Sequence, residues 1–388
     1  MKIVHICLSG GGYTEGLTYQ ENIIPKYQIR DGHEVALITT EYCLHEGNWG
    51  LCETEKDYFN SYGLHVIRLP FAYKLPYKIN KQIGIFKGTM QVLERLKPEV
   101  IYVHNIQFQD IRTIVRYKKK HRDVKVYVDN HADFSNSARN WITKNVLYRF
   151  WWKPCAKKIE PYTEVFWGVM PSRINFLKNI YGISAEKTDL LVMGADDECV
   201  ERAAVMEVKK RVRKRFNIRE EDFLIITGGK IDAFKTQTLL LMEAVGNIQN
   251  DKVKLLVFGS VDENLKGRLM ELCDGKKVQY IGWAKGEQSY KYFAAADLVV
   301  FPGRHSVYWE QVVAQGIPML CKYWDGTTHV DIGGNVEFLT KDSAQEIQQK
   351  IEELLSCPEK YERMKQAANG KGKEEFSYAR IARKSVGL

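Results

Sequence analysis

The chain has 388 residues and a net charge of +9; 45% of its residues are hydrophobic and 27% are charged. An aromatic content of 12% and dense runs of Val, Ile and Leu exclude an intrinsically disordered protein. No stretch approaches the roughly eighteen consecutive apolar residues that a membrane-spanning helix requires. A chain of this length exceeds the size at which one hydrophobic core stops growing, so two domains are expected.

The first residues, MKIVHICLSGGG, contain an apolar run that is too short for a signal peptide. We interpret them as the first strand of a cytoplasmic protein. Eight cysteines lie far apart without a C-x-x-C pair, which excludes zinc-ribbon and thioredoxin-type sites. The cysteines are therefore predicted to be reduced, and most of them to be small core residues.

Short apolar runs alternate with helical segments along the whole chain. In the first half, strands are predicted at Lys2–Leu8, Glu34–Thr40, His65–Leu69, Val100–His104, Lys125–Asn130 and Val165–Met170. In the second half they are predicted at Phe223–Thr227, Val253–Phe258, Val278–Ile281, Leu298–Phe301, Pro318–Lys322 and Glu337–Leu339. Helices are predicted at Thr18–Arg30, Ile83–Leu96, Arg139–Lys158, Thr236–Ile248 and Ala344–Leu355. This alternation predicts an α/β fold with parallel sheets covered by helices.

A seam between about Met170 and Asn217 separates the two halves. It contains a helix that begins with a proline, a short predicted strand at Asp189–Met193 and a charged segment at Glu198–Glu221. We therefore predict one domain at 1–170 and a second at 171–370. The remaining segment, 371–388, is expected to pack back on the first domain.

Basic residues gather in three segments. Those within Arg112–Lys125 and Lys209–Arg215 are interpreted as solvated helix faces. The third segment, Trp141–Lys158, interleaves cations with aromatic residues, including the Trp151–Trp152 pair. That mixture suits the boundary of lipid headgroups and predicts peripheral contact with an anionic membrane. No recognised nucleic-acid-binding module accompanies these clusters, so no nucleic-acid partner is expected.

Two glycine-containing loops follow predicted strands. Gly11 and Gly12 come after the first strand, where they either let a ligand approach peptide N–H groups or make a tight strand–helix turn. Gly229 precedes Lys230, and Lys235 stands just before the predicted helix at Thr236–Ile248. Helix N-termini and lysines attract anions, so a diphosphate would fit there. The alternative is that both lysines are solvated loop residues.

Glu310 begins another predicted helix, after the strand Leu298–Phe301 and a Pro-Gly loop. A carboxylate in the first helical turn is stabilised by the helix dipole, which would be a structural role. Its two acceptor oxygens could instead bind both hydroxyls of a ribose. The residues alone leave both roles open.

Together these segments resemble the retaining nucleotide-sugar glycosyltransferases of family 4. The segments that carry the resemblance are Gly32–Val35 (G-H-x-V), Gly229–Lys235 (G-R-x(4)-K, with Lys230 in place of Arg), Asp297–Pro318 (A-D-x(4)-P…E-A-x-A-x-G-x-P), Met193–Asp196 (N-G-x-D) and Gly333–Asn335. The resemblance implies a GT-B fold, in which two Rossmann-like domains face a cleft. It also implies that the first domain binds the acceptor and the second binds the nucleotide sugar.

The resemblance further implies transfer of a sugar, of the hexosyltransferase type, from a nucleoside diphosphate sugar to a saccharide or lipid-linked saccharide. Surface polysaccharide or glycolipid synthesis at the inner face of the membrane is the expected setting. Apart from the donor substrate, no cofactor is expected. The sequence contains no D-x-D pair, so the enzyme is predicted to be metal-independent, with Lys230 and Lys235 stabilising the departing diphosphate.

One departure from the family concerns the donor sugar. The family commonly has two glutamates spaced E-x(7)-E, and Glu310 matches only the second. The preceding loop contains no acidic residue. We therefore expect the sugar to be bound by backbone amides or by His305, Ser306 or Tyr308.

His131 follows the strand Lys125–Asn130, and the resemblance implies that it lies at the interdomain cleft near the reacting sugar. A histidine there can donate a hydrogen bond to a sugar hydroxyl or a carbonyl. Its alternative role is that of a satisfied turn residue beside Asp129 and Asp133. His104 and Asn105 end the preceding strand on the same edge, so an acceptor-side role is plausible for them too.

Two other functions remain open for the same fold. A sugar-nucleotide epimerase would need acid and base groups from both domains. A non-catalytic scaffold would have lost its chemistry with the missing glutamate.

Overall fold

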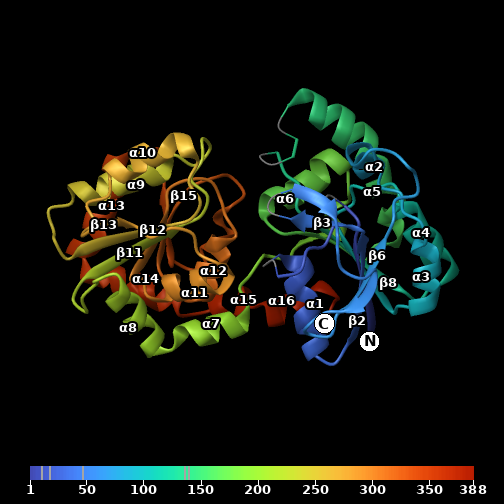
Figure 1. The fold of residues 1–388 in the computed structure, drawn as a ribbon, viewed down its shortest axis with the longest axis horizontal. Coiled ribbons are helices and arrows are strands. Elements are labelled where there is room, and N and C mark those ends of the chain that lie inside the picture. Colours follow the sequence, from blue (N-terminus) through green and yellow to red (C-terminus); the bar gives the residue numbers. More distant parts are fainter. Residues whose placement is uncertain (10–11, 17–18, 46–47, 135–136, 139) are drawn as a thin grey trace. The chain divides into compact units, whose positions relative to one another are not determined.

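The computed structural model describes residues 1–9, 12–16, 19–45, 48–134, 137–138 and 140–388 (Figure 1). It divides into two compact units. One unit is formed by Met1–Val192 together with Ile381–Leu388, and the other by Met193–Arg380. Among the described residues, none of the helices combines the length and apolar character that crossing a bilayer requires.

The first unit is built on a largely parallel sheet. Its strands are β1 (Lys2–Cys7), β2 (Glu34–Thr40), β5 (Asp57–Phe59), β6 (His65–Leu69), β7 (Val100–His104), β8 (Lys125–Asn130), β9 (Val165–Gly168) and β10 (Thr188–Leu190). They lie in the order β10-β9-β8-β7-β1-β2-β6-β5, with only β5 antiparallel to its neighbour in this sheet. Strands β3 (Tyr42–His45) and β4 (Asn48–Leu51) form a separate antiparallel pair.

Helices flank this sheet. They are α1 (Gln20–Arg30), α2 (Tyr77–Ile83), α3 (Thr89–Leu96), α4 (Ile111–Lys120), the π-helical η1 (Thr143–Trp152), α5 (Lys153–Ile159), η2 (Glu160–Tyr162), α6 (Pro171–Phe176), η3 (Leu177–Tyr181), η4 (Ala185–Lys187) and the C-terminal α16 (Tyr378–Ser385). Helix α1 packs on β1 and β2, whereas α3, α4 and α5 pack side by side. Their buried Leu, Ile, Ala and aromatic side chains share one core with Val103 and Val128 of the sheet.

The second unit contains a wholly parallel sheet in the order β13-β12-β11-β14-β15-β16. Its strands are β11 (Phe223–Gly228), β12 (Val253–Phe258), β13 (Val278–Tyr280), β14 (Leu298–Phe301), β15 (Met319–Lys322) and β16 (Val336–Leu339). Its helices are α7 (Asp197–Ala204), α8 (Met206–Arg215), α9 (Gln237–Asn247), α10 (Glu263–Glu271), α11 (Gly286–Ala294), α12 (Tyr308–Ala314), η5 (Thr328–Val330), α13 (Ala344–Ser356), α14 (Pro358–Ala368) and α15 (Gly372–Glu375). Helices α9 and α13 cover the core beside β11, β12 and β14.

The boundary between the units lies within the predicted seam between about Met170 and Asn217, but later than the predicted domain limit at residue 170. Strand β10 pairs with β9, so the chain remains part of the first sheet beyond residue 171. Phe176 and Tyr181 are likewise buried in the first core. At the other end of the chain, Arg383 forms two 2.8 Å contacts with the Asp31 carboxylate, and Ile381–Leu388 belong to the first unit.

Several predicted elements need correction. The single helix predicted at Ile83–Leu96 is wrong, because Gly84 and Gly88 adopt positive φ angles of 60° and 102° and separate α2 from α3. The short strands β3, β4 and β5 were not among the predicted elements. Cys43 and Cys52 form a disulfide, so the prediction of reduced cysteines is wrong for this pair. The antiparallel pairing of β3 with β4 brings the two residues together.

Candidate functional site

Parallel sheets bind ligands beyond the carboxyl ends of their strands, where the direction of strand addition reverses. In the second sheet this point lies between β11 and β14. The loop after β11 contains Gly229, Lys230 and Lys235, and the loop after β14 contains Gly303–Tyr308. In the first sheet the corresponding point lies between β1 and β7. The predicted site residues therefore follow strands at these two points or, for His131, the neighbouring strand β8.

The loop after β11 needs its glycines for close packing. Gly229 has a φ of 132°, which side chains rarely tolerate, and its N–H donates to the Phe258 carbonyl at 3.0 Å. A Cβ on Gly259 would lie 1.7 Å from the Gly229 oxygen. The loops after β11 and β12 are thus pressed against one another, which fixes the backbone that carries Lys230 and Lys235.

Three cations gather at this loop. Lys230 is exposed and lies 3.2 Å from the Asp232 carboxylate, whereas Lys235 is partly buried. Burial lowers the pKa of Lys235, and the positive charges of Arg304 and Lys230 lower it further against the opposing effect of Asp232. An anion bound here would relieve the repulsion among Lys230, Lys235 and Arg304.

The loop after β14 contacts the same backbone. A Cβ on Gly303 would lie 3.9 Å from the Lys235 Cα and 3.2 Å from the Gln237 side-chain oxygen. Glycine therefore allows the two loops to lie side by side. This contact explains how Arg304, which is distant in sequence, becomes part of the cation cluster.

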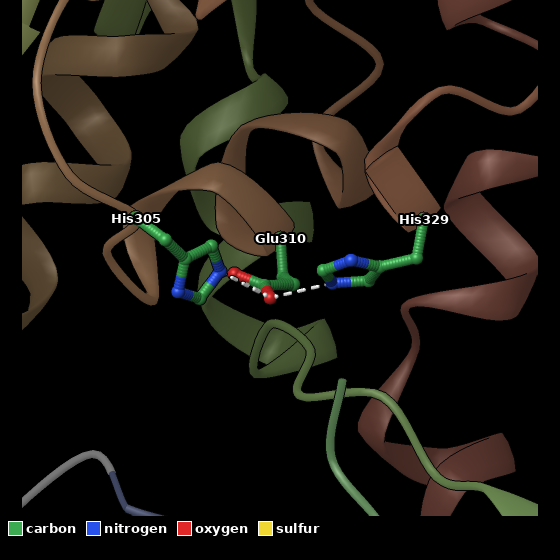
Figure 2. A group of neighbouring side chains, drawn as sticks. All are labelled: His305, Glu310 and His329. Carbon is green, nitrogen blue, oxygen red and sulfur yellow. Dashed lines mark hydrogen bonds and ion pairs between the residues drawn. The ribbon is translucent and has the colours of Figure 1, made fainter. Parts of the chain in front are cut away.

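Glu310 lies at the centre of a buried cluster with two histidines (Figure 2). His305 approaches from one side and His329 from the other, and their Nε2 atoms lie 2.8 and 2.9 Å from Glu310 Oε1. The Glu310 side chain has no exposed surface. Burial raises the pKa of the Glu310 carboxyl, but the charge and hydrogen bond of His305 and the hydrogen bond of His329 outweigh burial and lower it overall.

The cluster also leaves buried polar atoms unpaired. Within the described part of the chain, no hydrogen-bond partner is found for Glu310 Oε2, His329 Nδ1 or Trp309 Nε1. The carboxylate predicted to bind ribose is therefore buried, and two imidazoles occupy one of its oxygens. A ribose hydroxyl could reach this carboxylate only after a local rearrangement, such as a shift of one imidazole.

The three ligand atoms of this cluster lie within 4.8 Å of one another, so the trio could also hold a metal ion. The measured separations of 2.8 and 2.9 Å are those of charge-assisted N–H···O bonds. Ligands of a tetrahedral zinc, each 2.0–2.1 Å from the ion, stand roughly 3.3 Å apart. The geometry therefore favours a hydrogen-bonded cluster.

Ser306 lies in the loop after β14, whereas Tyr308 is the first residue of α12. Ser306 braces the start of α12, where its hydroxyl accepts a hydrogen bond from the Tyr308 N–H at 3.4 Å. The ring of Tyr308 packs against Phe258 and Phe293, and burial raises the pKa of its hydroxyl. The structure therefore groups His305 with Glu310 and directs the Tyr308 ring into an aromatic cluster.

The glycine loop of the first unit is explained by packing. A Cβ on Gly12 would lie 2.3 Å from the Thr40 methyl group and 2.9 Å from the Thr39 hydroxyl, and its φ is 84°. The neighbouring candidate, Gly11, lies outside the described residues. For Gly12, the structural role as a tight turn accounts for the glycine without a ligand.

His131 is tied to two neighbouring strand ends. Its backbone N–H donates to Asn105 Oδ1 at 2.9 Å, and the Asn105 backbone N–H donates to Asp129 Oδ1 at 2.9 Å. Its imidazole lies 3.4 Å from Asp129 Oδ2 and is 28% exposed, whereas Asp129 is fully buried. Burial raises the pKa of Asp129, but the positive charges of His131 and His104 outweigh it and lower that pKa overall.

Sequence reasoning missed His329 and did not single out Arg304 from its loop. His329 follows β15, a strand next to β14, so its place at the same sheet edge was a usable signal. The glycines after it serve a local turn, in which Asp331 Oδ1 accepts hydrogen bonds from the N–H groups of Gly333 and Gly334.

Residues 208–371, within the second unit, match the family model described as glycosyl transferases group 1. The whole chain is similar to the crystal structure of HepE (Alr3699) from Anabaena in complex with UDP, with a TM-score of 0.68 at 14% identity, covering 99% of this chain and 98% of that one. The chain has the GT-B fold.

Other GT-B structures are similar over the same extent. A glycosyltransferase from Rickettsia africae has a TM-score of 0.67 at 14% identity, with 99% of this chain and 96% of that one covered. The UDP-GlcNAc 2-epimerase from Neisseria meningitidis, bound to UDP-GlcNAc, has a TM-score of 0.61 at 14% identity, with coverages of 99% and 98%. Among curated proteins, none has a significantly similar sequence.

Proposed function

We propose that this chain is a glycosyltransferase that moves a sugar from a nucleoside diphosphate sugar to a saccharide or a lipid-linked saccharide. The observation that carries the proposal is the cation cluster of Lys230, Lys235 and Arg304, inside the segment that matches glycosyl transferases group 1. A diphosphate suits this cluster because it brings compensating negative charge. HepE binds UDP and UDP-glucose in its crystal structures, so uridine diphosphate sugars are the first donors to test.

The proposed reaction retains the configuration of the sugar, as in family 4, and is of the hexosyltransferase type. The bond between the anomeric carbon and the diphosphate oxygen breaks, and the diphosphate keeps the electron pair. The acceptor hydroxyl attacks the anomeric carbon from the side that the diphosphate leaves, and its proton passes to the departing phosphate. Lys230, Lys235 and Arg304 stabilise the charge that develops on the diphosphate, without a metal ion.

The remaining candidates act on the sugar and the ribose in this proposal. His305 and the loop around Ser306 contact the donor sugar, and Glu310 orients His305 or, after a shift of one imidazole, binds the ribose. His131 donates a hydrogen bond to a sugar hydroxyl.

An epimerase is the second candidate, because structures of UDP-GlcNAc 2-epimerases share this fold.

A transfer assay with nuclear magnetic resonance detection distinguishes a glycosyltransferase, an epimerase and a non-catalytic scaffold. A glycosyltransferase forms an acceptor-dependent product, and retention gives that product the anomeric configuration of the donor. An epimerase converts the donor sugar without an acceptor. Binding of the donor without either product would favour a non-catalytic scaffold.

We also propose that the enzyme works on the cytoplasmic face of a membrane, in surface polysaccharide or glycolipid synthesis. The segment around η1 supports this with apolar side chains that are strongly exposed. Trp141 is 73% exposed and Phe150 is 74% exposed, with Ile142 and Val146 between them on the same segment. Trp152, which the sequence placed in the membrane-facing pair, is instead buried in the core of the first unit.

The charge of this segment matches an anionic bilayer. No Asp or Glu occurs between Asp133 and Glu160, whereas Lys144, Arg149 and Lys153 follow Trp141. Exposed aromatic and aliphatic side chains among cations are typical of helices that lie in the interface of an anionic membrane. Such an attachment would bring the enzyme to a lipid-linked acceptor.

A further inference from the structure

A line of polar contacts runs from His131 into the interior of the first unit: an ion-pair contact between His131 and Asp129, and then three hydrogen bonds. Asp129 Oδ2 lies 3.4 Å from His131 Nε2 and 2.9 Å from His104 Nδ1. His104 Nε2 lies 2.9 Å from His5 Nδ1, and His5 Nε2 lies 2.7 Å from Gln28 Oε1. The members come from β8, β7, β1 and α1, except that His131 directly follows β8, and of these residues only His131 has appreciable exposure.

The hydrogen bonds of Gln28, at the buried end of this line, determine which nitrogen of His5 carries a proton. The side-chain NH₂ group of Gln28 donates to the Ser385 hydroxyl at 3.2 Å and faces the Ala382 carbonyl at 3.5 Å. A backbone carbonyl can only accept, so the Gln28 oxygen must point to His5. His5 Nε2 therefore carries a proton.

The surroundings of the two rings indicate which of them is charged: His5 faces the neutral side-chain amide of Gln28, whereas His104 faces the Asp129 carboxylate. This geometry favours a neutral His5. Burial and the neighbouring His104 lower the pKa of His5 to about 3. With its one proton on Nε2, His5 Nδ1 has a lone pair and can only accept. The hydrogen bond between the two imidazoles therefore requires a proton on His104 Nε2.

The other nitrogen of His104 faces Asp129. A lone pair on His104 Nδ1 would repel the carboxylate oxygen at 2.9 Å, so this nitrogen also carries a proton. His104 is then an imidazolium, and its charge neutralises Asp129 inside the core. The His104 ring also contacts the Tyr102 ring edge-on, with 4.9 Å between the ring centres.

We propose that His104 is a buried cation that keeps Asp129 ionised, and that the pair positions the His131 imidazole. Asp129 holds that imidazole through Oδ2 and accepts a hydrogen bond from the Asn105 backbone N–H through Oδ1. The Asn105 side-chain oxygen in turn accepts a hydrogen bond from the backbone N–H of His131. His5, which is itself held by Gln28, holds His104 through the His104 Nε2 atom. The role of this pair in catalysis rests on the proposed function, whereas its protonation does not.

Nitrogen-15 spectra of the histidine rings in the full chain test the protonation directly. The expected result is that His104 is doubly protonated and His5 carries a proton only on Nε2 across pH 6–8. The His104→Asn variant assigns the signals. A neutral His104 at pH 7 would overturn the proposal whether or not the protein transfers sugar.

The positioning role is tested by the pH profile of transfer. His104→Asn keeps a donor toward Asp129 but removes the cation, and Asp129→Asn removes the carboxylate charge. Each variant is expected to lower kcat at least tenfold, with little change in donor KM, and to shift the pH profile of kcat. The double variant is expected to have a kcat only slightly lower than that of either single variant. The control is His121→Asn, since His121 also faces a carboxylate, Glu94 at 3.2 Å, but precedes β8 rather than following it. An unchanged kcat and pH profile in His104→Asn would refute the positioning role.

Discussion

The guanidinium of Arg304 lies 5.3 Å from the centre of the Phe234 ring. This exposed ring directly precedes Lys235 in the chain, so the cation–π contact places the Arg304 guanidinium over the loop that carries Lys235. Arg304 and Lys235 come from different strand ends of one sheet. The cation cluster is thus a product of the fold and not of a continuous sequence motif.

Replacing Lys235 with alanine is expected to lower kcat by about 10²–10³-fold, the effect of removing one preorganised donor from a developing oxyanion. Lys235→Arg should recover only part of the loss, because a planar guanidinium does not reproduce a compact ammonium. Lys266→Ala removes an exposed lysine of α10 and serves as the control. Equal turnover by Lys235→Ala and the control would exclude the proposed role of Lys235.

Glu310→Gln is expected to reduce both nucleotide affinity and stability. The sequence alone predicts weaker ribose binding, by at least tenfold, with little change in melting temperature. The structure replaces the second part of this prediction with a loss of stability, since the carboxylate accepts two buried hydrogen bonds, and bonds to charged groups contribute about 1.5–3 kcal/mol each. Denaturant unfolding at pH 7 measures this loss, and an unchanged free energy of unfolding would contradict the buried cluster.

The stability of the wild-type protein relative to Glu310→Gln should also depend on pH. The pKa of Glu310 is lower in the folded protein than its ordinary value. Its ionised form therefore contributes stability above the unfolded-state pKa of about 4.3, and this contribution is lost as the pH falls through the folded-state pKa. Unfolding curves at pH 6 and pH 3.5 are expected to show a smaller difference between the two proteins at the lower pH. A difference that grows on acidification would contradict the lowered pKa.

Turnover is expected to survive an excess of chelator. The sequence has no D-x-D pair to hold a divalent cation, and the cation cluster is available to the leaving diphosphate. The measurement is transfer before and after chelator treatment, followed by addition of magnesium, manganese or zinc. Loss of activity with chelator, restored by magnesium or manganese, would refute metal-independent stabilisation of the diphosphate. Restoration by zinc alone would instead indicate a metal bound by His305, Glu310 and His329.

The protein is expected to float with anionic vesicles and not with neutral ones. Trp141→Ser with Phe150→Ser should abolish flotation by removing the two most exposed rings of the segment, and Lys144→Glu with Arg149→Glu should weaken it strongly. The matched control is Lys210→Glu with Arg211→Glu, which reverses the same charge on α8. Equal flotation of all variants would contradict a membrane-facing role for this segment.

Most strands of both sheets were predictable because they are largely buried and therefore continuously apolar. β3, β4 and β5 escaped prediction because they are short and include polar or exposed residues, such as Asn48 and Asp57. Gly84 and Gly88 separate α2 from α3 in a stretch that the sequence predicts as part of one helix. The composition of this stretch does not reveal the positive φ angles that break it.

The site was partly predictable for a similar reason. Residues that follow strands, such as Lys235 and His131, can be placed at a sheet edge from the strand pattern. Which side chains then meet depends on long-range packing. His329 joins Glu310, and His5 joins His104, only because the sheets align strands that are distant in sequence. The burial of Trp152 could not be predicted for the same reason, because it depends on how the helices pack in three dimensions.

The central claim is that the cluster around Lys235 binds the diphosphate of a nucleotide sugar, and calorimetric titration measures this most directly. UDP, GDP and ADP, and their sugars, should be titrated into the wild-type protein, Lys235→Ala and Lys266→Ala. We predict that at least one nucleotide binds, that it adds about 2.7 kcal/mol of apparent stability at 100 times its Kd, and that only Lys235→Ala weakens it tenfold or more. Failure of every nucleotide to bind, or equal binding by Lys235→Ala and the wild-type protein, would contradict the claim.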